Sequence, residues 1–152
     1  MSQPALICDT GALIDYLVAS APDHLAFRLA IDAARARYIP GLVLAEVDYF
    51  LRGQRNAMRS LINDIHRGAF TYAPPTESQL SRALAIDAQY AGLEIGLVDA
   101  TIVALAEELD LLRLATRDVR HFAALRLADG RAFELVVMPP AAAEPRRPRR
   151  KR

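Results

Sequence analysis

Hydrophobic residues in this chain form short continuous runs that alternate with helically spaced stripes. The runs at residues 5–8 and 111–115 are largely apolar, which is typical of strands covered on both faces of a sheet. After the first run, apolar residues recur at helical spacing over residues 11–17. A buried strand followed directly by a helix is therefore predicted at the start of the chain.

The rest of the chain continues this alternation. Spacing and capping signals predict helices over 22–33, 42–52, 56–67, 76–90, 99–109 and 119–125, and short apolar or alternating runs predict strands over 38–40, 70–73 and 131–138. Thr76 followed three residues later by Gln79 is a capping-box signal. Because the connections are too long for hairpins, the pattern predicts an α/β fold with a mostly parallel sheet and helices on both faces.

The same spacing predicts which helical residues face the core. Glu46 lies on the apolar face of its helix, where a glutamate costs free energy unless something compensates it. A buried arginine such as Arg113 is one candidate for that compensation. The predicted inward faces are Leu25, Leu29 and Ala33; Val43, Val47, Phe50 and Leu51; Leu61, Ile62 and Ile65; and Leu80, Leu84 and Ala88.

Length and composition limit the possible settings of the protein. A chain of 152 residues forms one domain that can bury a sizeable core. Its single cysteine, Cys8, lies in the first apolar run, which predicts a buried free thiol and a reducing, cytoplasmic location. No apolar run approaches the roughly 20 residues that span a bilayer, so no membrane association is expected.

Charge is distributed unevenly along the chain. Residues 139–152 contain six basic residues and one acidic residue, a net charge of +5, which leaves −4 for residues 1–138 of a chain whose total is +1. The chain is therefore predicted to have two parts, a folded domain over 1–138 and a disordered Pro/Arg-rich basic tail over 139–152. The tail is either a solubilising extension or an arm that contacts phosphate.

Four acidic residues occupy comparable places in the predicted elements. Asp9 and Asp118 each follow a predicted strand, whereas Glu46 and Asp99 lie on inward faces near helix starts. Each has a simple explanation, because aspartate is a preferred N-cap residue and helix N-termini stabilise negative charge. Parallel strands, however, direct these junctions to one edge of the sheet, where α/β proteins bind ligands. We therefore expect the four acids to converge.

Converging carboxylates require a cation, because several of them within a few ångströms cannot all stay ionised otherwise. Oxygen ligands without histidine or cysteine suit a hard divalent ion, Mg²⁺ or Mn²⁺. Such an ion binds phosphate and lowers the pKa of a water that attacks phosphorus. This predicts metal-dependent hydrolysis of a phosphodiester by a protein whose folded part is acidic.

Four segments resemble the signature motifs of PIN-domain ribonucleases: CDTGAL at 8–13, VLAEV at 43–47, GLVDA at 96–100 and TRDVRHF at 116–122. Chain length and motif order most resemble VapC-type toxins of bacterial toxin–antitoxin pairs. The resemblance implies a PIN-like three-layer sandwich, a Mg²⁺- or Mn²⁺-dependent endoribonuclease, an RNA substrate, a homodimer and a cognate VapB-type antitoxin. It also implies catalytic, metal-binding acids at Asp9, Glu46, Asp99 and Asp118, with supporting hydroxyls at Thr10 and Thr116.

Other functions remain as alternatives. A non-catalytic PIN-like scaffold has the same fold, although it has no need of all four acids. A phosphoacceptor receiver domain needs an acid beside Asp9 and a lysine near the phosphate, and Lys151 in the tail is the only lysine. An aspartate-nucleophile phosphatase needs a second acid at position 11, which is Gly11.

Some polar residues near the motifs have secondary roles in this interpretation. Arg117 and Arg120 are candidates for contacting an RNA phosphate. His121 lies close to Asp118 in sequence and is a minor candidate for the site, whereas His24 and His66 are expected on surface helices.

Overall fold

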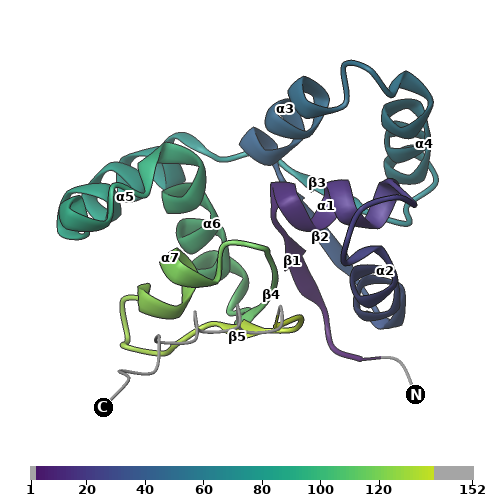
Figure 1. Ribbon diagram of the computed structural model, residues 1–152. Coiled ribbons are helices and arrows are strands. Elements are labelled where there is room, and N and C mark those ends of the chain that lie inside the picture. Colours follow the sequence, from purple (N-terminus) through teal and green to yellow (C-terminus); the bar gives the residue numbers. More distant parts are fainter. Residues whose placement is uncertain (1–2, 139–152) are drawn as a thin grey trace, which may run out of the picture.

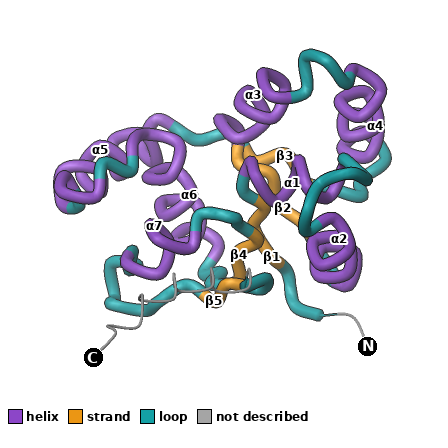
Figure 2. The backbone as a smooth tube through the Cα atoms, in the orientation of Figure 1, coloured by secondary structure: helices purple, strands orange, loops and turns teal. Residues whose placement is uncertain are grey.

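Five short parallel strands make the central sheet of the computed structural model, which describes residues 3–138 (Figures 1 and 2). The predicted basic tail at 139–152 lies outside the described residues. The strand order is β3-β2-β1-β4-β5, so the predicted parallel sheet is confirmed. The strands are Leu6–Cys8 (β1), Arg37–Pro40 (β2), Thr71–Ala73 (β3), Arg113–Ala115 (β4) and Glu134–Leu135 (β5).

Helices cover both faces of this sheet, as the alternation predicted. Figure 1 shows α1, α2 and α4 on one side of β1 and α5, α6 and α7 on the other. None of the helices within residues 3–138 is long and apolar enough to cross a membrane. The helices are Thr10–Leu17 (α1), His24–Ala33 (α2), Gly41–Phe50 (α3), Arg55–His66 (α4), Glu77–Gln89 (α5), Gly96–Leu109 (α6) and Val119–Ala124 (α7), with a short 3-10 helix at Ala91–Leu93 (η1).

The strand order reverses direction at β1. The chain runs outward from β1 to β2 and β3, then returns through α5 and α6 to place β4 on the other side of β1. This arrangement creates a switch point at the carboxyl ends of β1 and β4, where ligands bind in open α/β sheets. The residues that directly follow these two strands, Asp9 and Thr116, therefore lie beside each other.

Local signals predicted the elements better than the faces that they bury. The capping box at Thr76 and Gln79 is confirmed in both directions. Buried Cys8 and the central position of β1 also agree with the prediction. The predicted strand over 131–138 is shorter, because only Glu134–Leu135 pairs in register with β4.

Several predicted inward positions are wrong. On α2 the buried residues are Phe27 and Ile31, whereas Leu25 and Leu29 are 75% and 74% exposed, because the helix turns its Phe27 face toward the core. On α5, Ala83 and Ile86 are buried instead of Leu84 and Ala88. Val43, Val47, Leu51 and Leu61 are buried as predicted, whereas Phe50, Ile62 and Ala33 are exposed.

Gly41 provides a test of packing at the start of α3, the helix that carries Glu46. A Cβ atom at this position would lie 2.7 Å from Pro74 Cα and 2.8 Å from Pro75 Cδ. Because a backbone atom cannot easily move aside, Gly41→Ala should lower the free energy of unfolding by about 1–3 kcal/mol, measured by urea denaturation. Gly53→Ala, whose Cβ would meet open space, is the control and should change stability by less than about 0.5 kcal/mol. Equal stability of the two variants would contradict this packing.

Candidate functional site

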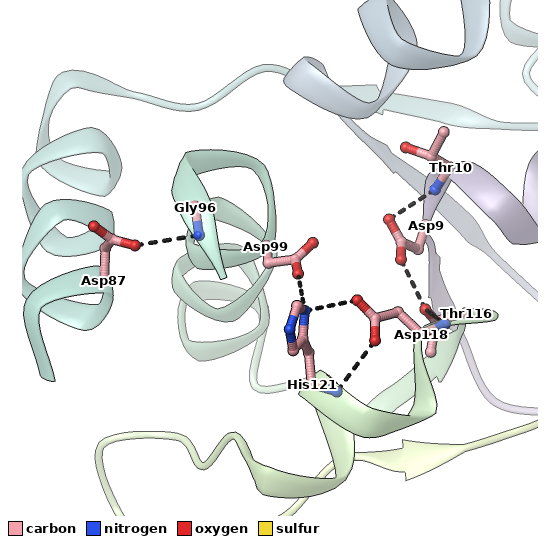
Figure 3. A network of polar contacts seen from close by, with 8 residues as sticks. All are labelled: Asp9, Thr10, Asp87, Gly96, Asp99, Thr116, Asp118 and His121. Carbon is pink, nitrogen blue, oxygen red and sulfur yellow. Dashed lines mark hydrogen bonds and ion pairs between the residues drawn. The ribbon is translucent and has the colours of Figure 1, made fainter. Parts of the chain in front are cut away.

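Asp9 connects β1 to α1 and is buried at the centre of the site. The backbone N–H of Thr10 donates to Asp9 Oδ1 at 2.7 Å, so Asp9 caps α1. Its second oxygen, Oδ2, accepts a hydrogen bond of 2.7 Å from the Thr116 hydroxyl (Figure 3). Capping therefore explains only one of the two carboxylate oxygens, and the other links the ends of β1 and β4.

The β4–α7 connection brings Asp118 to the same place. The Thr116 hydroxyl, besides donating to Asp9, accepts from the Asp118 N–H at 3.0 Å. Asp118 Oδ1 in turn caps α7 by accepting from the His121 N–H at 3.1 Å. One buried threonine hydroxyl thus holds together two of the four predicted acids.

Asp99 reaches the cluster from the first turn of α6. The start of this helix is tied to α5, because the Gly96 N–H donates to Asp87 Oδ1 at 3.2 Å (Figure 3). The ring nitrogen Nδ1 of His121 lies 2.7 Å from Asp118 Oδ2 and 3.2 Å from Asp99 Oδ2. Ligand atoms of these three side chains all lie within 4.8 Å of one another.

Glu46 joins the site through a second threonine. The Thr10 hydroxyl donates to Glu46 Oε1 at 2.6 Å, while the N–H of the same residue bonds Asp9. The alternative that Arg113 compensates Glu46 is wrong, because Arg113 donates to the Pro4 carbonyl and lies 3.8 Å from Glu134. The four predicted acids are thus connected by two threonines and one histidine.

Charge crowding is visible in the pKa values of the buried acids. Burial raises the pKa of Asp9, and the charges of Glu46 and Asp118 raise it further, against the lowering effect of the hydrogen bonds from Thr116 and Thr10. Burial, followed by the charge of Asp9, raises the pKa of Asp99 to about 7. A divalent cation among these side chains would remove this repulsion. The donor set, mainly carboxylate oxygens with one imidazole nitrogen, fits Mg²⁺ or Mn²⁺.

Two side chains differ from their sequence-based interpretation. His121 was a minor candidate, yet it contacts both Asp99 and Asp118. Its position three residues after Asp118 puts both on one face of a helical turn, a signal that could have identified it. Arg117, a candidate for contacting RNA, instead pairs with the carboxylates of Asp15 and Asp23.

Comparisons with known proteins agree with this architecture. The PIN-domain family model matches residues 6–127. Ribonuclease VapC26 of Mycobacterium tuberculosis is 34% identical over 134 residues, which cover 86% of this chain and 99% of that protein. The chain therefore belongs to the PIN-domain family, and within it to the VapC-type ribonucleases that serve as toxins of toxin–antitoxin systems.

Solved structures share the fold. VapC20 of Mycobacterium tuberculosis, described as a toxin that cleaves the sarcin–ricin loop, superposes with a TM-score of 0.69 at 14% identity, covering 75% of this chain and 90% of that chain. A toxin–antitoxin complex from Klebsiella pneumoniae gives a TM-score of 0.62 at 23% identity, covering 79% and 92%. The predicted PIN-like fold is confirmed, and the receiver and phosphatase alternatives are set aside.

The raised pKa of Asp99 predicts a pH dependence of stability in a chelator. Between its ordinary value of 3.8 and about 7, the folded protein keeps a proton on Asp99 that the unfolded chain has released. The contribution of Asp99 to stability is therefore full below about pH 4 and is lost as the pH rises through about 7. Relative to the unsubstituted protein, Asp99→Asn should gain stability between pH 5 and pH 8, measured by urea unfolding in EDTA.

Asp64→Asn serves as the control for this experiment. Asp64 lies on α4 and pairs with Arg67 on the protein surface, away from the acidic cluster. Its stability difference from the unsubstituted protein should not grow over the same pH range. A constant difference for Asp99→Asn as well would contradict the raised pKa of Asp99 that burial and the charge of Asp9 cause.

Proposed function

We propose that this ribonuclease is a Mg²⁺- or Mn²⁺-dependent endonuclease whose catalytic site consists of Asp9, Glu46, Asp99 and Asp118. The observation that carries the proposal is the convergence of acids from four separate segments onto one network of hydrogen bonds. Figure 3 shows three of these acids, Asp9, Asp99 and Asp118. Burial and mutual repulsion raise the pKa of Asp9 and of Asp99. A stable fold without a cation gains nothing from such crowding, whereas a metal site requires it.

Different acids would contribute differently to holding the cation. Asp99 and Asp118, with oxygens close to each other and to His121, would provide the most concentrated donor group. Asp9 and Glu46 would complete the negative site from the β1 and α3 sides. When bound, the cation would neutralise these carboxylates, polarise an RNA phosphodiester and favour ionisation of an attacking water.

The threonines have an orienting role in this proposal. Thr116 bonds one oxygen of Asp9 and the amide of Asp118, so the two carboxylates keep a constant relative position. Thr10 does the same for Asp9 and Glu46 through its N–H and its hydroxyl. Orientation of ligand carboxylates by hydrogen bonds commonly strengthens metal binding. These contacts agree with the role that the motif resemblance implies for both threonines, which is to supply hydroxyls that assist the acids.

Partner proteins follow from the toxin class. The Klebsiella pneumoniae structure similar to this chain is a toxin–antitoxin complex. We infer that the present chain likewise binds a VapB-type antitoxin, forms a homodimer and acts on RNA in the cytoplasm. The antitoxin would silence the nuclease by obstructing the acidic site.

The nuclease proposal predicts cleavage of a structured RNA in Mn²⁺ and none in excess EDTA. Asp9→Asn and Asp99→Asn should each lower the cleavage rate at least ~100-fold, because each removes a negative charge that the cation needs. Asp64→Asn, which alters a surface ion pair, should cleave at the rate of the unsubstituted protein. Gel analysis of end-labelled RNA measures the cleavage rate of the unsubstituted protein, with Mn²⁺ and with EDTA, and of the three variants. Cleavage that persists in EDTA would exclude a metal-dependent mechanism.

The partner proposal predicts a stable complex with the product of an adjacent small reading frame. Co-expression of the two proteins should yield a complex that survives size-exclusion chromatography. Adding the purified partner protein to the toxin should suppress RNA cleavage in proportion to the concentration of the partner. Light scattering of the separate toxin should give the mass of two chains. A neighbouring protein that neither co-purifies nor inhibits would contradict the inferred antitoxin, and the mass of a single chain would contradict the dimer.

A further inference from the structure

Arg117 lies between two residues of the acidic site, Thr116 and Asp118, but its side chain extends in another direction. Its Nη1 donates to the carboxylate of Asp15 on α1 and, at 2.7 Å, to Oδ2 of Asp23 at the start of α2. A single Nη1 carries two N–H groups, one for each carboxylate. The β4–α7 connection is thus joined through this arginine to two helices on the far side of β1.

Two features around Arg117 favour its position: a buried carboxylate and a residue without a side chain. Asp15 is only 5% exposed, and a buried carboxylate is costly unless a charged partner compensates it. The stem of Arg117 also lies against Gly11, where a Cβ atom would come within 3.1 Å of Arg117 Cδ and 3.2 Å of its Cβ and Cγ. Absence of a side chain at Gly11 therefore allows the arginine to run closely along α1.

The same connection is attached to α1 at two points. On its inner side, the Thr116 hydroxyl bonds Asp9, the residue that caps α1. On its outer side, Arg117 bonds Asp15, which lies on α1 itself. Both contacts are made with α1 or its N-cap residue, so α1 holds residues 116–118 at two points. Loss of either attachment would leave the short connection free to shift and move Asp118.

We propose that Arg117 is a positioning residue that anchors the β4–α7 connection to Asp15 and Asp23, and thereby holds the Asp118 carboxylate and the Thr116 hydroxyl against Asp9. The inference rests on the proposed function, in which this cluster binds a divalent cation. It makes Asp15 and Arg117 a functional pair although neither belongs to the acidic cluster. The competing role, direct contact of Arg117 with an RNA phosphate, requires no contribution from Asp15.

Calorimetric titration of Mn²⁺ into the full-length, chelator-treated protein tests this role without relying on turnover. Arg117→Ala and Asp15→Asn should each weaken Mn²⁺ binding about 10-fold, the size of effect seen when groups that orient metal ligands are removed. Because both variants break the same contact, the double variant should be little weaker than either single variant. In RNA cleavage, all three should lower kcat with little change in KM.

Arg82→Ala provides the matched control. Arg82 pairs with Glu107 between α5 and α6, and its side chain is 37% exposed, against 38% for Arg117. It should keep Mn²⁺ affinity within about twofold whatever thermal stability it loses, because surface ion pairs away from a site contribute little beyond their own contact. A general loss of stability is thereby separated from a change in the site. Arg117→Lys, which keeps the charge, should bind Mn²⁺ with intermediate affinity even if Arg117→Ala fails to fold.

Each result distinguishes between the proposals. If the unsubstituted protein neither binds Mn²⁺ nor cleaves RNA, the proposed function fails and the positioning role fails with it. If the unsubstituted protein binds Mn²⁺ but Arg117→Lys and Asp15→Asn bind it equally well, only the positioning role is overturned. A raised KM for Arg117→Ala, together with unchanged kinetics for Asp15→Asn, would assign Arg117 to the RNA phosphate instead.

Discussion

The rest of the site depends on the two hydrogen bonds that the buried carboxylate of Asp9 accepts. One oxygen caps α1 and the other accepts from Thr116 after β4, so a single side chain joins two neighbouring strands at their carboxyl ends. Burial disfavours its charge, and the hydrogen bonds only partly offset this effect. The proposed cation would therefore neutralise charges that burial disfavours.

Sheet topology explains why the acidic residues gather at one place. β1 and β4 are adjacent because the chain reverses its direction of strand addition after β3. At such a switch point the following segments diverge to opposite faces of the sheet and leave room for a ligand. Glu46 on α3 and Asp99 on α6 then complete the cluster through Thr10 and His121. A VapC-type ribonuclease thus obtains its acidic site from chain connectivity more than from any single motif.

Much of this was predictable from local patterns, and the exceptions have a common cause. The capping box at Thr76 and the strand at β1 depend on neighbouring residues, so both were predicted. The buried face of α2 was not, because Leu25 and Phe27 offer competing apolar faces and only packing against α1 chooses between them. Arg117 was misjudged for the same reason, since its partners Asp15 and Asp23 lie in other elements. The contact of His121 with Asp99 on α6 is also set by packing between elements.

The sequence by itself determined the order of strands and helices and the four acidic residues that the family motifs contain, because hydrophobic periodicity, capping and motif spacing are local properties. Only the tertiary structure decided which groups meet: Thr116 bonds Asp9 across 107 residues, and Arg117 reaches Asp15 across 102. Such contacts depend on the register and twist of the assembled sheet. No short stretch of sequence encodes them, because their distances are set by the packing of the whole domain.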